Sequence, residues 1–339
     1  MSLDLIVEVG NAHEGSLGIA TSFVDIIKST GAKCIKFQMH LPEFESSENE
    51  PFRKKFSAQD RTRVDYWNRV GFSFEEWKYL ISYTKGADLE FLCTPFSVEA
   101  AKWLFENAEM KRWKVGSGDA TNFPLLSFLS ESELPILIST GLVSWNELLK
   151  IREFLTARRA WERVTLMHCV SQYPTPLEFS ALNLIGDLRK LDVNVGLSDH
   201  SGDVAVALRA MSIGVKTIEV HLTPHLQFFG PDTTSSLLSA DIEFLLSVSD
   251  KWNLIDSNKV RRDEMLNMVK ETRRIFGRGI YWKRDLPAGH IISIDDLAFL
   301  KPSSEVPALE YLDIIGKITL CEVQAKTPIS RSKIKVQNV

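Results

Sequence analysis

The sequence predicts an α/β protein: a (β/α)₈ barrel followed by a small β-rich module. Three observations support this fold class. Eight short apolar runs recur in the first two-thirds of the chain, and an amphipathic segment follows almost every one. No GxGxxG or GxxxxGK[ST] motif follows the first run. After residue 279 the pattern changes to short strands separated by turns. The eight apolar runs lie at 5–10, 34–39, 90–95, 112–118, 135–140, 164–170, 193–199 and 217–222.

Each apolar run has the length and the β-branched content of a buried strand. Helices that cover both sides of apolar strands imply parallel pairing with right-handed crossovers. Eight such units within about 240 residues fit a closed barrel. A doubly wound open sheet is the alternative, but it usually carries a glycine-rich phosphate loop after its first strand. We therefore favour the barrel.

The segment 41–72 is too long for an ordinary connection between a strand and a helix. It mixes charged and aromatic residues and ends just before a helix that begins near Ser73. Two interpretations remain open at this point. The segment is either a lid over the mouth of the barrel or a surface excursion with a short helix of its own.

The chain divides by pattern into residues 1–245 (barrel), 246–278 (helical linker) and 279–339 (β-rich module). Turn residues at 287–289 and 295–296 separate the short strands of the module. The module has only about 60 residues, too few for a large core, so we expect it to pack on something else.

Composition excludes several classes of protein. The chain has 339 residues, is 44% hydrophobic and carries a net charge of −4, from 40 basic and 44 acidic residues. This balance excludes a disordered chain, and the lack of basic excess gives nucleic-acid binding little support. No apolar run approaches the length of a membrane helix, and the N-terminus lacks the basic start of a signal peptide. Four scattered cysteines, with no CxxC pair, are typical of reduced thiols. We expect a cytoplasmic protein.

Polar residues collect at the ends of the predicted strands, where barrel enzymes have their active sites. A lysine inside a barrel strand is unfavourable unless it meets an anion, and Lys36 and Lys114 both occupy such positions. With nearby hydroxyls they would bind a phosphate, or a phosphate with a carboxylate. Two alternatives remain: each lysine pairs with an internal acid such as Glu8 or Glu219, or one lysine forms a Schiff base. The hydroxyl candidates are Thr94, Ser117, Ser139, Ser171 and Ser198.

Two histidines end adjacent predicted strands, His200 and His221. Neighbouring strands are about 4.8 Å apart, so both imidazoles could share one divalent ion and leave its other positions open. The alternative is that each ring is a hydrogen-bonded core residue. Asp232, in the last loop, would either contact a polyol or cap the loop.

The chain resembles the sialic acid synthase family, which includes N-acetylneuraminate synthase and its legionaminic and pseudaminic acid relatives. The segment 279–302 resembles that family's antifreeze-like (SAF) domain. The resemblance covers nearly the whole chain in the right order. The matching stretches are EVGNAHEGSL, AKCIKFQ, CTPFS, WKVGSGDATNFPLL, ILISTGLVS, LMHCVSQYPTP, VGLSDHSG, IEVHLT and GPDTTSSL.

The resemblance implies a transferase that condenses phosphoenolpyruvate with an N-acylated amino sugar. The products are a nine-carbon 2-keto acid and phosphate. It implies that His200 and His221 bind Mn²⁺ or another divalent metal, and that a domain-swapped homodimer brings Lys301 to the partner's sugar site. The residues that would hold phosphoenolpyruvate are Lys36, Thr94, Lys114, Ser117, Ser139, Ser171 and Ser198. Those that would contact the sugar or order the water are Glu14, Gln38, Asp119, Tyr173 and Asp232.

Three departures from the family pattern all concern the sugar. The family's Asn-His is Ala12-His13 here, its Gly-Ser-Gly-Glu ends in Asp119, and an arginine is replaced by Lys301. The choice between neuraminate, legionaminate and pseudaminate precursors therefore stays open. A condensing enzyme for a phosphorylated aldose is an alternative, and a non-catalytic carbohydrate-binding protein is a weaker one.

Overall fold

A computed structural model describes residues 3–52 and 56–336, and it confirms the predicted barrel. Eight parallel strands follow the order β3-β2-β1-β8-β7-β6-β5-β4, and β3 lies against β4 to bring the ends of this path together. A short strand, β9 (Ser236–Leu237), extends β8. The barrel strands are β1 (Asp4–Gly10), β2 (Cys34–Met39), β3 (Glu90–Pro95), β4 (Trp113–Val115), β5 (Ile136–Ser139), β6 (Val164–His168), β7 (Asn194–Asp199) and β8 (Thr217–Leu222).

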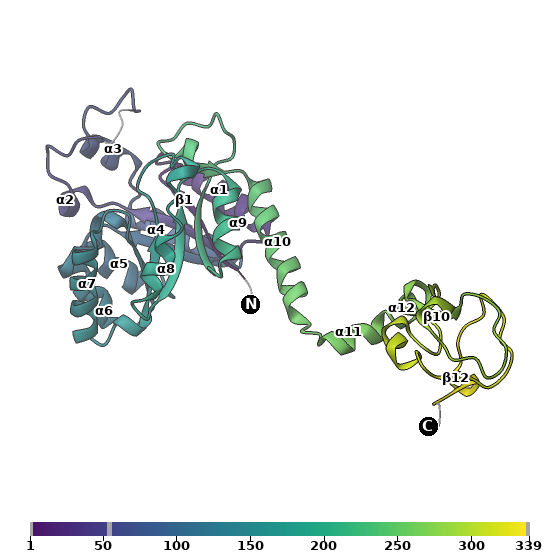
Figure 1. The fold of residues 1–339 in the computed structure, drawn as a ribbon. Helices are drawn as coiled ribbons and strands as arrows, with labels where there is room; N and C mark the ends of the chain where they lie inside the picture. Colours follow the sequence, from purple (N-terminus) through teal and green to yellow (C-terminus); the bar gives the residue numbers. More distant parts are fainter. Residues whose placement is uncertain (1–2, 53–55, 337–339) are drawn as a thin grey trace. The chain divides into compact units, whose positions relative to one another are not determined.

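Helices surround the strands, as the amphipathic segments predict (Figure 1). Serine caps fix where several of them begin. Ser73 and Ser144 each accept a hydrogen bond from the backbone N–H three residues on, and Glu76 and Glu147 complete the two capping boxes. The helices are α1 (Leu17–Thr30), α4 (Phe74–Gly86), α5 (Val98–Asn107), α6 (Phe123–Glu131), α7 (Trp145–Ala157), α8 (Leu184–Arg189), α9 (Val204–Ser212) and α10 (Ser239–Ser257).

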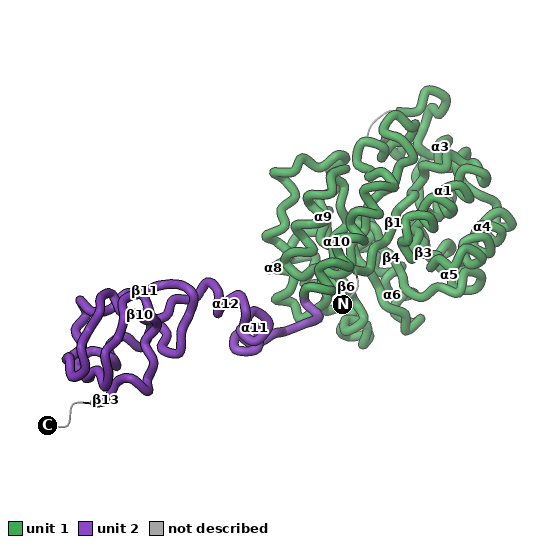
Figure 2. Tube along the Cα trace, turned by 90° about the vertical axis from the view of Figure 1, so that its right-hand side faces the viewer, with its two compact units in different colours: residues 1–255 green, residues 256–339 purple. Residues whose placement is uncertain are grey.

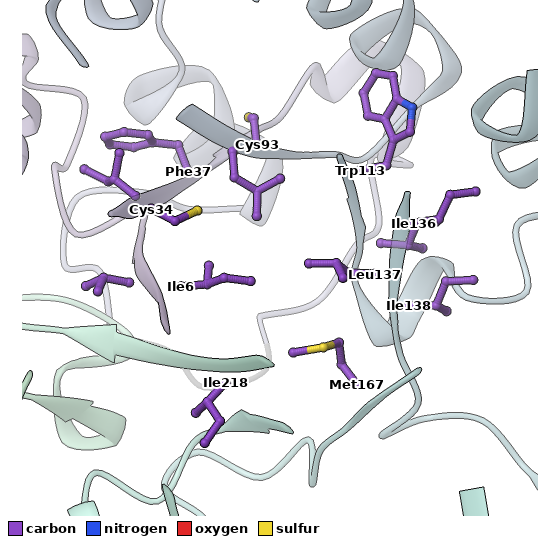
Figure 3. Packing of buried hydrophobic residues seen from close by; sticks show 14 of the residues in the cluster. Ile6, Cys34, Phe37, Cys93, Trp113, Ile136, Leu137, Ile138, Met167 and Ile218 are labelled. Atoms are coloured by element: carbon purple, nitrogen blue, oxygen red, sulfur yellow. The ribbon is translucent and has the colours of Figure 1, made fainter. Parts of the chain in front are cut away.

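The barrel interior is apolar below the ends of the strands. Ile6, Leu137 and Met167 point towards one another inside the ring of strands (Figure 3) and are almost completely buried. Side chains two residues apart on a strand share a face, so the residues directly above this layer also point inward. For Ile6 that residue is Glu8, and for Leu137 it is Ser139. The strands thus change from apolar to polar within one layer.

The segment 41–72 contains two short helices, α2 (Pro42–Glu45) and α3 (Arg63–Val70) (Figure 1). It is a packed excursion, because Tyr66, Trp67 and Val70 are buried on α3. Thr62 and Asp65 form a capping box that fixes the beginning of this helix.

The chain separates into two compact units, residues 1–255 and 256–339 (Figure 2). The second unit contains two short antiparallel sheets and a core of its own that includes Ile280, Trp282 and Ile314. No helix among the described residues has the length and apolar character needed to cross a membrane. The elements are α11 (Arg262–Met268), α12 (Lys270–Phe276), β10 (Gly279–Trp282) with β11 (Leu297–Leu300), and β12 (Ile318–Thr319) with β13 (Ile334–Lys335).

One buried carboxylate organises the second unit. Asp296 is completely buried and accepts hydrogen bonds from Ser293, Arg284 and His290. Burial by itself raises the pKa of Asp296, but the bonds from these residues outweigh it and hold the pKa well below its ordinary range. The carboxylate is therefore charged in the folded protein, and its donors join two turns of the unit.

We predict that Asp296→Asn lowers the free energy of unfolding of the second unit by about 2–4 kcal/mol, because charge-assisted bonds to a buried acceptor are lost. The lowered pKa means that this stabilisation is present above a pH of about 4 and decreases as the pH falls below it. Calorimetry of the full chain between pH 3 and pH 7 measures both effects. Asp295→Asn, at an exposed neighbour, is the control. Equal stability of the two variants would contradict the role of Asp296.

Candidate active site

A cavity of about 490 Å³ opens at the carboxyl ends of the barrel strands, where the sequence predicts the site. Parallel strands of a barrel all end at the same rim, so residues far apart in the chain meet there. The predicted residues that line the cavity are Lys36, Gln38, Thr94, Lys114, Ser117, Ser139, Ser171, Tyr173, Ser198, His200, Asp232 and His221.

Buried charges occupy the floor of this cavity. The Lys36 ammonium lies 2.7 Å from a Glu8 carboxylate oxygen and 3.8 Å from Glu219. Lys114 donates to Glu219 over 2.8 Å, and Ser198 donates to the same oxygen over 2.9 Å. Strands β1, β2, β4 and β8 each contribute one charged side chain, and all four side chains are almost inaccessible to solvent. We call Glu8, Lys36, Lys114 and Glu219 the charge quartet.

Charge compensation keeps the quartet ionised. Burial disfavours the Lys36 ammonium, but the Glu219 and Glu8 carboxylates outweigh it and raise the lysine pKa above its ordinary value. Burial likewise disfavours the Glu219 carboxylate, but Lys114 and Lys36 hold its pKa well below the usual range. The structure therefore matches the alternative in which both lysines pair with internal acids.

These ion pairs still leave donors for a ligand. A lysine ammonium has three N–H groups. Lys36 donates to Glu8 and Thr94, and Lys114 donates to Glu219, so each retains at least one N–H. The Ser139 hydroxyl is buried at the cavity wall and has no hydrogen-bond partner among the described residues. Buried polar groups normally find partners, so an unpartnered hydroxyl here is consistent with a missing ligand atom.

The two histidines lie side by side at the rim. Their ring centroids are 5.4 Å apart, and Tyr173 stacks on His200 with centroids 4.2 Å apart. Burial, and then the neighbouring His221, lower the pKa of His200 to about 3, so its ring is neutral. Its Nδ1 lies 3.2 Å from the Val170 carbonyl oxygen, which can only accept. Nδ1 therefore carries the proton, and Nε2 keeps a lone pair, as a metal ligand requires.

The histidine pair is a partial ligand set. Among the described residues, no three His, Cys, Asp or Glu side chains converge to hold a metal by themselves. A divalent ion on the two histidines would need oxygen ligands from substrate or water. Open positions of this kind characterise catalytic metal sites. The residues present thus fit such an ion in part.

Three predicted residues do not line the cavity. Glu14 forms an ion pair with Arg69 over 2.9 Å and accepts from the Tyr66 hydroxyl, so it ties helix α3 to the end of β1. Asp119 accepts from Asn122 at the start of α6, and burial raises its pKa. Lys301 belongs to the second unit.

The structure adds residues that sequence reasoning did not assign to the site. Asn11 donates to the Gln38 side-chain oxygen over 3.2 Å, and the Gln38 amide donates to Glu8 over 2.6 Å, which fixes the glutamine in the cavity wall. An aromatic and cationic wall comes from the excursion. Its members are Phe52, Phe56, Arg63, Tyr66 and Trp67. The alternation of charged and aromatic residues in 41–72 was the one sign of this wall.

We predict that Lys36→Met lowers the free energy of unfolding by about 3–5 kcal/mol, because it leaves the buried Glu8 carboxylate without its cation. The double variant Glu8→Gln/Lys36→Met removes both charges and should recover at least half of this loss. Denaturant unfolding of the full chain measures the three free energies.

The control is Lys78→Met, which removes an exposed ion pair with Glu75 and should change stability by less than about 1 kcal/mol. A Lys36→Met variant as stable as this control would show that the quartet is not held together by charge compensation.

Comparison with known proteins gives the family. The NeuB family model matches residues 23–261, and a SAF domain model matches 277–335. The N,N'-diacetyllegionaminic acid synthase of Campylobacter jejuni is 28% identical over 324 residues, 93% of this chain and 95% of that protein. The mouse N-acetylneuraminate-9-phosphate synthase is 25% identical over 98% of this chain and 92% of its own. A sialic acid synthetase structure from Leptospira borgpetersenii has a TM-score of 0.69 at 25% identity, covering 80% of this chain and 92% of that chain. The chain therefore belongs to the NeuB family and carries a C-terminal SAF domain.

Proposed function

We propose that the protein is a transferase that condenses phosphoenolpyruvate with an N-acylated amino sugar and releases phosphate. The product is a nine-carbon 2-keto acid of the sialic acid type. One observation carries the proposal: in a NeuB-family chain, two buried lysines, a set of hydroxyls and two neutral-ring candidates for metal binding converge on one cavity. The related proteins are named as synthases of such acids.

The deeper half of the cavity suits phosphoenolpyruvate. Its phosphate and carboxylate would accept the remaining N–H groups of Lys36 and Lys114, and charge-assisted bonds of this kind are the strongest that the chain offers. The hydroxyls of Thr94, Ser117, Ser139, Ser171 and Ser198 would complete the binding of these two anionic groups. The unpartnered Ser139 hydroxyl supports this assignment.

Metal binding is part of the proposal. His200 and His221 would hold Mn²⁺ or another divalent ion through neutral imidazoles. When bound, such an ion acts as a Lewis acid that polarises the sugar aldehyde. Tyr173 stacks on His200, and the Val170 carbonyl fixes that ring's proton on Nδ1, so both orient the ligand nitrogen.

In the proposed reaction the enolpyruvate methylene carbon attacks the aldehyde carbon and forms the new C–C bond. Water then adds to the pyruvyl carbon, and the tetrahedral intermediate expels phosphate to leave the keto group. Lys36 and Lys114 stabilise the phosphate in this step, because they remain cationic beside their carboxylates. Gln38 and Asp232, which lie at the rim, would hold the sugar hydroxyls.

The Schiff-base alternative finds less support. Imine formation needs a neutral, desolvated lysine with a lowered pKa. Glu219 and Glu8 instead raise the pKa of Lys36. A borohydride-trapped adduct on Lys36 or Lys114 would contradict this choice.

We predict that His200→Ala and His221→Ala each lower turnover by at least about 10³-fold, because the polarisation of the carbonyl is lost. Phosphate release from phosphoenolpyruvate, with acceptor sugar and Mn²⁺, measures the rate. Thermal unfolding of each variant should stay close to wild type, since the rings line a cavity. Wild-type turnover in metal-stripped buffer by either variant would contradict the metal role.

We also propose a cytoplasmic homodimer in which the SAF unit of one chain completes the sugar site of the other. Four unpaired cysteines support a reducing compartment. The second unit carries exposed apolar side chains, of which Leu309 and Leu312 are 90% and 67% exposed. A small unit gains stability by covering such surface, and two-fold symmetry makes the exchange reciprocal. Lys301 would then reach the partner's sugar.

We predict that mixing inactive His221→Ala subunits with inactive Lys301→Ala subunits restores part of the activity, because one site of each mixed dimer is intact. Phosphate release after verified subunit exchange measures the recovery. No recovery, or a fully active monomer, would contradict the exchange. A fully active Lys301→Ala variant would contradict only the role of that side chain.

A further inference from the structure

Helix α3 forms one wall of the cavity, and neither the charge quartet nor the histidine pair uses it. Arg63, Tyr66 and Trp67 on this helix line the cavity, together with Phe56 from the preceding loop. Opposite them, residues 230–232 and Thr234 of the loop after β8 line the same space. The rings of Phe56 and Phe229 are 6.0 Å apart, so the two loops meet beside the mouth. Helix α3 is therefore placed to contact whatever occupies the outer half of the cavity.

The wall is firmly anchored. The His40 ring lies between Trp67 and Phe96, with centroid distances of 3.7 Å and 4.2 Å and nearly parallel planes. His40 Nδ1 is 2.7 Å from Glu45, which ties this stack to α2. On the other side of α3, Tyr66 donates to Glu14. A side chain that is held in one orientation binds a ligand group without losing much conformational entropy.

One polar atom of this wall lacks a partner. Trp67 is only 6% exposed, and its indole Nε1 has no hydrogen-bond partner among the described residues. An indole nitrogen can only donate, and buried indole N–H groups usually find an acceptor. A carbonyl oxygen of a ligand would supply that acceptor, while an aromatic wall suits the methyl group of an acyl substituent.

The charges of the outer cavity exclude a second strong anion site among the described lining residues. Arg63 is the cation of this wall, and it already lies 3.3 Å from Glu50. Asp232 lines the opposite side and adds a negative charge. Lys301, if it reaches this site, is a single point charge. A phosphate dianion on the acceptor sugar would therefore meet no bidentate cationic cradle.

Resting on the proposed function, we infer that α3 is the recognition wall for the acyl group of the acceptor sugar. Trp67 donates its indole N–H to the acyl carbonyl oxygen, and the Tyr66 and Phe56 rings pack against the acyl methyl. The wall selects an uncharged N-acylated sugar over its phosphate ester.

The test measures phosphate release with phosphoenolpyruvate, Mn²⁺ and three acceptors. These are N-acetylmannosamine, a diacetamido-6-deoxyhexose and N-acetylmannosamine 6-phosphate. Trp67→Phe keeps a ring to stack on His40 but removes the N–H. With the better uncharged acceptor we expect its KM for the sugar to rise about 5- to 10-fold, the worth of one hydrogen bond, while the KM for phosphoenolpyruvate is unchanged. Arg61→Ala is the matched control, since Arg61 precedes α3, is almost fully exposed and does not line the cavity.

The outcomes separate the two proposals. No phosphate release by the wild type with any acceptor overturns the proposed function, and this inference with it. Preference for the 6-phosphate, an unchanged sugar KM in Trp67→Phe, or an equal rise of both KM values overturns the inference alone. If Trp67→Phe does not fold, Tyr66→Leu provides the same comparison through the loss of ring contact with the acyl methyl.

Discussion

The buried charge quartet is the constraint on which the rest of the site depends. Glu8 and Lys36 are register partners on adjacent strands, and Glu8 is also opposite His221 on β8. Closing the barrel therefore brings two acids, two lysines and a histidine into neighbouring layers. Removing charges from water is expensive, and a well-packed apolar layer at this depth would give a more stable barrel. The layer directly below, with Ile6 and Leu137, is of that apolar kind. The quartet thus marks the depth at which the barrel changes from support to binding.

Neutrality of the quartet has a consequence for its ligand. Two lysines balanced by two carboxylates offer directed N–H groups but no net positive charge. A phosphate-plus-carboxylate ligand brings several negative charges into this low-dielectric space, where each uncompensated charge is costly. A divalent ion on His200 and His221 would offset most of them. Lysine pairing and metal binding are therefore two parts of one charge balance, with the lysines orienting the anion and the metal compensating it.

The barrel and the inner half of the site could be predicted from the sequence, because both depend on short-range periodicity. Residues two apart in a strand share a face, so Lys36 with Gln38 and Glu219 with His221 were expected to point inward together, and all four line the cavity. The outer half depends on tertiary packing that has no period. Trp67 reaches the cavity wall because its ring stacks on His40, at the end of another element. The same packing turns Glu14, a candidate for sugar contact, into an anchor for α3.

The two halves of the site also differ in what can change without loss of the fold. The anion-binding residues of the floor lie on strands, where one altered charge disturbs three partners. The residues proposed for the sugar lie on loops, short helices and a second unit, which carry little of the barrel core. All three departures from the family pattern, at Asn11 and Ala12, at Asp119 and at Lys301, lie at such positions. A fixed pyruvyl floor under an adjustable sugar wall explains how one barrel accommodates different acyl-amino sugars, and it locates the specificity of this chain in α3 and its supports.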